Sequence, residues 1–267
     1  MIRHRLAANL HPPQGRPGST SVQLLVSVRN AEEAVVAQNL GVQWIDLKNP
    51  DAGSLGPAPA SVAQAVAGTL RGGAAAPPLM MSAAAGELRD APLATALKLA
   101  QLFPLVKVGL SGMGGQTGWQ SQFRDLALQL HAAGTELVPV IYADHHQSGA
   151  PQPHEVLAVA EEIQVELEPG WQDQAKPRFL LIDTHTKDGR RLLDWFTLAQ
   201  LSEICAQARA TGRQTVLAGS LRAADVPQLL PLAPAAVAVR GAVCTSHRRS
   251  NLCPQKVTQW LELVQNR

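Results

Sequence analysis

The sequence has few cysteines, few charged residues and no long apolar run, and these shortages exclude several classes of protein. Three of the 267 residues are cysteines and no two form a Cys-x-x-Cys pair, which argues against a disulfide framework or a zinc cluster and for a reducing cytoplasm. No run of about 18 apolar residues occurs, so we expect no membrane-spanning helix. Residues 1–20 also lack the sustained apolar segment of a secretory signal.

Charged residues make up 16% of the chain, with 23 basic against 21 acidic side chains. Residues 1–20 hold three of the arginines and no acid, so the rest of the chain is close to neutral. A neutral body offers no basic surface for nucleic acid. Because residues 1–22 are also rich in Pro, Gly and Ser, we expect a flexible N-terminal extension there.

Several catalytic and nucleotide-binding motifs are absent. The chain has no Gly-x-Ser-x-Gly and no His-Glu-x-x-His, and its Gly-rich segment 111–118 lacks the Gly-Lys-Ser/Thr ending of a phosphate-binding loop. His145 and His146 are adjacent after an expected strand and should point to opposite faces, so we expect no shared metal ion. We therefore expect neither a metal nor a cofactor.

What is present is a regular alternation of short apolar segments and Ala/Leu-rich amphipathic segments. The apolar segments predict strands at 24–28, 44–48, 78–83, 105–110, 137–144, 179–184, 215–220 and 235–241. The amphipathic segments predict helices at 31–40, 58–70, 91–102, 119–133, 154–167, 194–210, 224–230 and 255–265.

Eight strand–helix units predict an α/β fold, a single (β/α)8 TIM barrel over residues 23–267. An open doubly wound sheet is the alternative, and it would more naturally carry a Gly-x-Gly-x-x-Gly turn after its first strand, which is absent.

Lysine is scarce, and its placement is informative. The six lysines are Lys48, Lys98, Lys107, Lys176, Lys187 and Lys256. Three of them, Lys48, Lys107 and Lys187, lie in or just after expected strands. Arginine cannot replace lysine where a deprotonated amine is needed, because its pKa stays above ~12. The pattern indicates amine chemistry; ordinary salt bridges at strand ends are the alternative.

In such a barrel the active site lies at the carboxyl ends of the strands. Asp46 and Lys48 share one face of their strand, and alternate strands supply the same interior layer, so Lys48, Lys107 and Asp183 should approach one another. Neighbouring ammonium groups and desolvation lower a lysine pKa. A neutral lysine can attack a carbonyl and form a Schiff base, which suits carbonyl condensation.

Turns after the last two expected strands predict a phosphate site, because Gly-containing turns let backbone N–H groups converge on an anion. The residues concerned are Gly219, Ser220, Arg240 and Gly241. Arg240 is alternatively a structural cation at a strand end. Ser54, in the segment Gly-Ser-Leu-Gly, is a second candidate for anion binding or part of a simple turn.

Five segments resemble one family, the (5-formylfuran-3-yl)methyl phosphate synthases. They are LLVSVRNAEEA (24–34), IDLKNPDAGSLG (45–56), KVGL (107–110), IDTHTKDG (182–189) and VAVRGAVC (237–244). The family is a (β/α)8 lyase of methanofuran biosynthesis in methanogens, with relatives in methylotrophic bacteria, and the Arg- and Ala-rich composition resembles a bacterial relative.

The resemblance implies that two molecules of glyceraldehyde 3-phosphate are converted to (5-formylfuran-3-yl)methyl phosphate with loss of phosphate and water. Lys48 matches the family's Schiff-base lysine and Lys107 its proton acceptor. Asp46, Asp183 and Lys187 match the other charged positions of the pocket. The alternatives are a class I aldolase acting on another sugar phosphate and a non-catalytic phosphosugar-binding barrel.

The expected partner is thus a small molecule, triose phosphate, rather than nucleic acid or a membrane. The Leu- and Ala-rich outer helices are compatible with a homo-oligomer.

Overall fold

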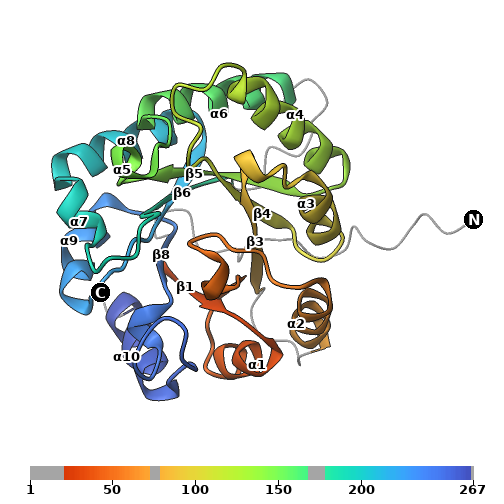
Figure 1. Ribbon diagram of the computed structural model, residues 1–267. Helices are drawn as coiled ribbons and strands as arrows, with labels where there is room; N and C mark the ends of the chain where they lie inside the picture. Colours follow the sequence, from red (N-terminus) through yellow and green to blue (C-terminus); the bar gives the residue numbers. More distant parts are fainter. Residues whose placement is uncertain (1–20, 73–78, 168–177, 266–267) are drawn as a thin grey trace, which may run out of the picture.

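Eight parallel strands close into a barrel in chain order, with the first strand paired to both the second and the last (Figure 1). The computed structural model describes residues 21–72, 79–167 and 178–265. The strands are β1 (Gln23–Val28), β2 (Trp44–Leu47), β3 (Met80–Glu87), β4 (Leu105–Gly109), β5 (Glu136–Tyr142), β6 (Arg178–Asp183), β7 (Arg213–Leu217) and β8 (Ala236–Val239). The prediction of a (β/α)8 TIM barrel is confirmed.

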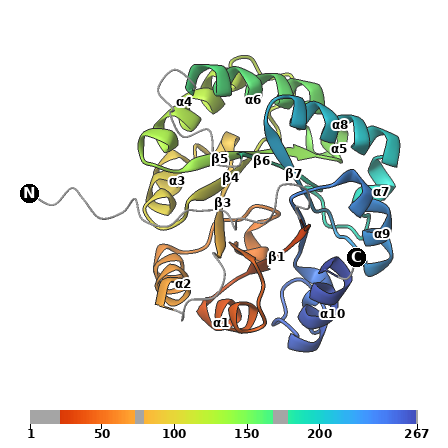
Figure 2. The same ribbon diagram turned by 180° about the vertical axis from the view of Figure 1, so that it is seen from behind.

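Helices surround the barrel, and the two views from opposite ends show the same ring (Figures 1 and 2). The longer helices are α1 (Ala31–Asn39), α2 (Ala60–Gly72), α3 (Leu93–Ala100), α4 (Trp119–Ala132), α6 (Pro153–Leu167), α8 (Leu198–Ala210) and α10 (Pro254–Gln265). One-turn elements are α5 (His145–Ser148), α7 (Leu192–Trp195), α9 (Val226–Leu229), η1 (Pro50–Ala52), η2 (Leu88–Asp90), η4 (Ala223–Asp225), η5 (Leu230–Leu232) and η6 (Gly241–Val243). The last helix, α10, packs beside α1 and so completes the ring.

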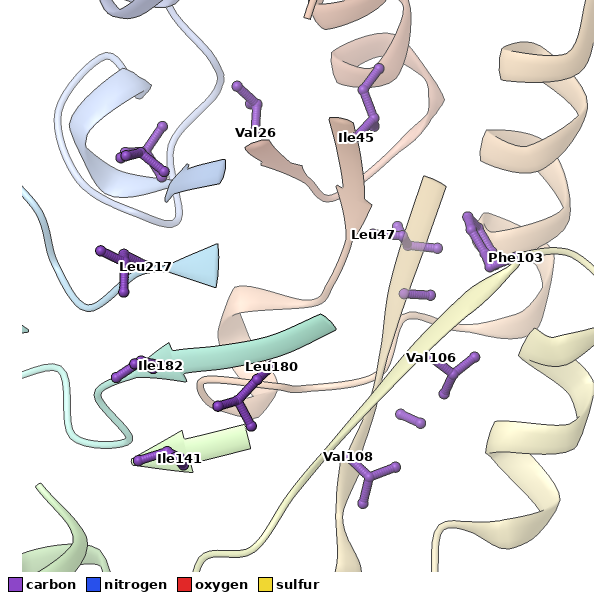
Figure 3. Close-up of a cluster of buried hydrophobic side chains, with 14 of the residues drawn as sticks. Val26, Ile45, Leu47, Phe103, Val106, Val108, Ile141, Leu180, Ile182 and Leu217 are labelled. Atoms are coloured by element: carbon purple, nitrogen blue, oxygen red, sulfur yellow. The ribbon is translucent and has the colours of Figure 1, made fainter. Parts of the chain in front are cut away.

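The core has two layers, because successive strand residues point to opposite faces. The outer layer lies between strands and helices, and Figure 3 shows part of it, including Val26, Ile45 and Val106. The inner layer fills the barrel and includes Trp44 and Phe179, whose rings meet edge to face with centroids 4.7 Å apart. The barrel is therefore packed at its centre, and open polar chemistry is confined to its mouth.

The bounds of several predicted elements were wrong: the seventh strand ends at Leu217 rather than at residue 220, and the helix expected over 194–210 is divided into α7 and α8. Two further differences lie close to the barrel mouth. The third strand was expected to end at residue 83 but continues to Glu87, past a register shift between Ala84 and Glu87. Its Ala-Ala-Ala-Gly sequence has little strand propensity by itself, but pairing with β4 keeps it extended. The fifth strand was expected to run to residue 144, but it ends at Tyr142, and His145 begins the short helix α5.

The expected extension over residues 1–22 lies outside the described residues, apart from Ser21 and Val22. Among the helices of the described ranges, none is both long enough and apolar enough to cross a membrane.

Candidate active site

The mouth of the barrel gathers charged side chains from the ends of β2, β4 and β6. Asp46, Lys107 and Asp183 belong to these strands, and Lys48 follows β2 directly. The backbone N–H of Lys48 donates to the Val28 carbonyl at 3.0 Å, which holds the lysine against the end of β1. All four residues are buried. The four charged residues that the strand pattern predicted at the carboxyl ends of the strands therefore lie there.

A tight loop follows Lys48 and returns to the site. The Asn49 side chain accepts a hydrogen bond from the Asp51 N–H at 3.0 Å, and the Asn49 N–H donates to Gly56 O at 2.8 Å. A Cβ at Gly56 would lie 2.5 Å from the Asn49 carbonyl oxygen, so only glycine fits. This turn places Ser54 inside the mouth.

Asp46 and Lys107 form the first of two ion pairs and both are buried, with the Lys107 ammonium against Asp46 Oδ1. The same oxygen accepts a hydrogen bond from Ser82 Oγ at 2.7 Å, and Oδ2 accepts one from Ser27 Oγ at 3.0 Å. Trp44 Nε1 donates to Ser82 Oγ at 3.0 Å and fixes that hydroxyl. The carboxylate is thus well satisfied, as a buried charge must be, and it orients Lys107.

Asp183 and Lys187 form the second pair, with Nζ donating to Oδ1 at 2.9 Å and to the Thr184 carbonyl at 2.6 Å. Ser54 Oγ lies 3.2 Å from Asp183 Oδ2. Burial alone would raise the pKa of Asp183, but the charges of Lys187 and Lys48, with hydrogen bonds from Lys187 and Thr184, lower it to about 2. Asp183 is therefore a carboxylate at any neutral pH.

Lys48 differs from both partnered lysines because its ammonium makes no hydrogen bond to another residue in the described parts of the chain. Burial lowers its pKa from 10.5 to about 8; Lys187 and Lys107 lower it further, while Asp183 and Asp46 oppose the shift. With that pKa, roughly a tenth of the side chains are neutral at pH 7, against fewer than one in a thousand for an ordinary lysine. Lys48 is thus the amine of this site best prepared to act as a nucleophile.

The turns after β7 and β8 contain backbone N–H groups without an acceptor among the described residues. Gly219 and Ser220 have φ angles of 101° and 52°, and Gly241 opens η6. The N–H groups of these three residues donate to no other residue within the described ranges. A Cβ at Gly219 would lie 3.2 Å from Thr184 Cγ2, so the turn sits directly against the loop that carries Lys187.

Arg240 occupies a structural position. Its guanidinium pairs with both carboxylate oxygens of Glu33 and also donates to the carbonyls of Ser27, Arg248 and Ser250. These contacts use its five N–H donors, so none remains for a phosphate. The geometry favours the alternative interpretation, a structural cation at a strand end.

Arg248, in the loop after η6, is a different cation at the mouth. Its backbone lies against Gly241, 3.9 Å from where a Cβ of that glycine would be, and its Nη2 donates to Gly53 O at 2.8 Å. Burial lowers its pKa, and attraction to Asp183 counters this. Arg248 therefore bridges the β8 turn and the loop that follows Lys48.

Glu87 and Tyr142 form another polar group, which lies nearer the barrel mouth than Lys107. Tyr142, the sole tyrosine of the chain, donates to Glu87 Oε1 at 2.7 Å, and the Ser111 N–H donates to Oε2 at 2.9 Å. Burial and the adjacent Glu87 carboxylate raise the pKa of Tyr142 well above its usual value. The phenol therefore stays protonated and acts as a donor.

The two adjacent histidines were expected to point to opposite faces, and this prediction was wrong. His145 and His146 lie in α5 rather than in a strand, and their ring centroids are 4.1 Å apart. Burial and the neighbouring His146 lower the pKa of His145. The described residues contain no group of three or more His, Cys, Asp or Glu side chains placed to hold a metal ion.

Comparison with known proteins decides the family. The family model of 4-HFC-P synthase matches residues 24–261. The chain belongs to the 4-HFC-P synthase family. A (5-formylfuran-3-yl)methyl phosphate synthase of Methanopyrus kandleri is 30% identical over 228 residues, which cover 83% of this chain and 89% of that protein. A Methylorubrum extorquens protein provisionally given the same name is 30% identical over 253 residues, covering 92% and 93% of the two chains.

Solved structures agree on the fold. A 3-hexulose-6-phosphate synthase from Salmonella typhimurium superposes with a TM-score of 0.57 at 17% identity, covering 90% of this chain and 98% of that one.

The relatives named (5-formylfuran-3-yl)methyl phosphate synthase are enzymes, so this chain is a member of an enzyme family. The family resemblance read from the sequence motifs is confirmed.

The site of this 4-HFC-P synthase family member contains residues that the sequence analysis did not select. Ser27 and Ser82 carry a detectable signal, because each lies on the inner face of its strand in register with Asp46. Glu87 was missed because the predicted third strand ended at residue 83, four residues before the observed strand ends. Arg248 was missed because nothing in the sequence places its loop over the barrel mouth.

Proposed function

We propose that the chain is a (5-formylfuran-3-yl)methyl phosphate synthase that joins two molecules of glyceraldehyde 3-phosphate through a Schiff base on Lys48. The observation that carries the proposal is the buried Lys48, which interacts electrostatically with both ion pairs, whose ammonium makes no hydrogen bond in the described chain and whose pKa is lowered to about 8. A binding module would have no need of such an amine. The family relationship supports the same reaction.

One glyceraldehyde 3-phosphate first isomerises to its ketone, as a proton leaves C2 and another is added at C1. The neutral Lys48 amine then attacks the ketone carbon. Water leaves and a cationic iminium forms. Asp183 and Asp46 interact electrostatically with Lys48 and stabilise the positive charge that the iminium retains.

The second step needs a base, and Lys107 is held for it by Asp46. The new iminium charge repels neighbouring ammonium groups, which favours loss of a proton from Lys107 to give the neutral amine. Lys107 then removes a proton from the carbon next to the iminium. The resulting enamine attacks the aldehyde of the second triose, and a carbon–carbon bond forms.

Later steps remove water and one phosphate and close the furan ring, whose aromatic stability drives the sequence forward. We assign the phosphate that is retained to the N–H groups of Gly219, Ser220 and Gly241, which donate to no other described residue. Arg248, rather than Arg240, supplies the neighbouring positive charge. Ser54, the other residue predicted to bind an anion, instead donates a hydrogen bond to Asp183.

The product identifies the reaction. Purified protein given glyceraldehyde 3-phosphate alone should generate near-ultraviolet absorbance from a furan aldehyde and release inorganic phosphate. A new sugar phosphate with no furan absorbance would instead identify a class I aldolase that acts on another sugar phosphate. We further propose that the furan serves a methanofuran-type carrier of one-carbon units, as in the family.

A further inference from the structure

Glu87, Tyr142 and His185 form a cluster separate from the two lysine–aspartate pairs. Glu87 is buried, and its two carboxylate oxygens accept from the Tyr142 hydroxyl and the Ser111 N–H. No lysine or arginine forms an ion pair with Glu87 within the described residues. A buried carboxylate whose partners are neutral donors is costly for a fold, which points to a functional reason for it.

His185 is the accessible member of the cluster. Its Nε2 lies 4.0 Å from Glu87 Oε1, and its ring meets Tyr142 edge to face with centroids 5.2 Å apart. The side chain is 28% exposed, so the imidazole is accessible to solvent. The backbone is fixed, because the N–H groups of His185 and Thr186 each donate to an Asp144 carboxylate oxygen at 2.7 Å.

Gly109 makes room for this cluster. A Cβ at Gly109 would lie 2.2 Å from Glu87 Oε2 and 2.3 Å from the Tyr142 hydroxyl, so any side chain would displace one of them. Gly109 is two residues beyond Lys107 on the same face of β4, about 6.6 Å nearer the mouth. Tyr142 pairs in register with Asp183. The cluster therefore lies at the same end of the barrel as the Schiff-base site, one layer above it.

The proposed function, on which this inference rests, leaves one requirement unassigned. When phosphate is eliminated, a base takes a proton from the adjacent carbon, that electron pair forms a double bond, and the carbon–oxygen bond breaks. The departing oxygen then needs a proton. Lys107 acts at the first triose, and Lys187 donates to Asp183 and the Thr184 carbonyl, so neither is assigned to that oxygen.

We propose that His185 donates this proton to the leaving phosphate oxygen, and that Glu87 and Tyr142 are positioning residues that orient its imidazole. The carbon–oxygen bond breaks as a proton moves from the imidazolium to the phosphate oxygen, and inorganic phosphate departs. His185 is left neutral and regains a proton from solvent. General acids of this kind contribute ~10²–10⁴-fold to a rate.

The test uses full-length His185→Asn and His185→Ala with two readouts, phosphate release and borohydride-trapped adducts on Lys48. We expect phosphate release and furan formation to fall by about 100-fold or more. The triose adduct should still form, and a condensed six-carbon adduct that retains both phosphates should accumulate. Added imidazole should restore part of the furan formation in His185→Ala. His146→Asn, an exposed histidine at the same mouth, is the matched control and should behave as wild type.

Glu87→Gln and Tyr142→Phe test the positioning role. Each should lower kcat for phosphate release with little change in KM, and each should accumulate the same six-carbon adduct, which a merely destabilised barrel would not do. Wild-type phosphate release in His185→Asn would overturn the inference, as would loss of the triose adduct together with the furan or a failure of imidazole to rescue His185→Ala. Absence of any adduct in the wild-type protein would instead reject the Schiff-base proposal.

Discussion

At the residue scale, Lys48 is set apart by what surrounds it. Lys107 and Lys187 each have a carboxylate in contact, whereas Lys48 is buried without a hydrogen-bond partner in the described structure. Burying the charged ammonium of Lys48 lowers the free energy of unfolding, and the lowered pKa reflects this loss of stability. Stability is thus given up at the residue that the proposed chemistry needs.

Replacing Lys48 with Met should therefore stabilise the protein at neutral pH. The folded-state pKa of about 8 lies below the ordinary value of 10.5, so the unfolded chain binds more protons between these two pH values. The cost of the charged lysine is fully present below pH 8 and disappears as pH rises toward 10.5. We expect Lys48→Met to gain roughly 2–4 kcal/mol at pH 7, with the gain shrinking across that window.

Urea unfolding of wild type and Lys48→Met at several pH values measures this difference. The exposed Lys98→Met on α3 is the control and should show little change. A difference between wild type and Lys48→Met that does not vary with pH would contradict the lowered pKa.

At the element scale, β4 shows how one strand serves two layers of the site. Lys107 reaches Asp46, and two residues later Gly109 leaves space for Glu87 and Tyr142. Its neighbour β3 ends in Glu87 because its last residues pair with β4 past an irregularity. The chemistry at the mouth thus depends on strand register as much as on residue type.

Gly109→Ala should destabilise the barrel by about 1–3 kcal/mol, because its methyl group overlaps Glu87 and Tyr142. Gly68→Ala is the matched control. Gly68 lies inside α2 with open space where the methyl group of an alanine would lie, so alanine should stabilise the helix by about 0.5–1 kcal/mol. Denaturant midpoints give both values. Equal effects of the two substitutions would contradict the packing described here.

Sequence reasoning succeeded where a local pattern reports the structure directly. The strand alternation and the scarcity of lysine placed Asp46, Lys48, Lys107, Asp183 and Lys187 at one edge. It failed where long-range contacts decide. The Ala-rich end of β3 is a strand only because β4 lies beside it, and the five donors of Arg240 are used by residues distant in sequence. The one-turn helix α5 has too few residues for a periodic signal.

At the scale of the whole molecule, Arg240 helps to close the barrel. It links the end of β8 to Glu33 of α1 and to the loop before α10, so the first and last units of the fold share one buried ion pair. Arg248, eight residues later, instead donates to the Gly53 carbonyl in the loop that follows Lys48. Two arginines of the same segment therefore have different expected roles.

Removing one partner of the buried pair should cost stability. Glu33→Gln leaves the buried Arg240 charge uncompensated and should lower the free energy of unfolding by about 3–5 kcal/mol. Arg248→Gln should leave that free energy nearly unchanged and raise KM for the triose phosphate by about tenfold, equivalent to one charge-assisted hydrogen bond. Unfolding curves and steady-state kinetics separate the two effects. A stable Glu33→Gln protein or an unaltered KM in Arg248→Gln would contradict the respective role.

The most direct test of the central claim is to trap the covalent intermediate. Wild-type protein and Lys48→Arg are each incubated with glyceraldehyde 3-phosphate and borohydride, then weighed intact and mapped by peptide mass spectrometry. We expect a reduced triose adduct on Lys48 in the wild type and none in Lys48→Arg, which keeps the charge and loses turnover. An adduct on another lysine, or rapid furan formation by Lys48→Arg, would contradict it.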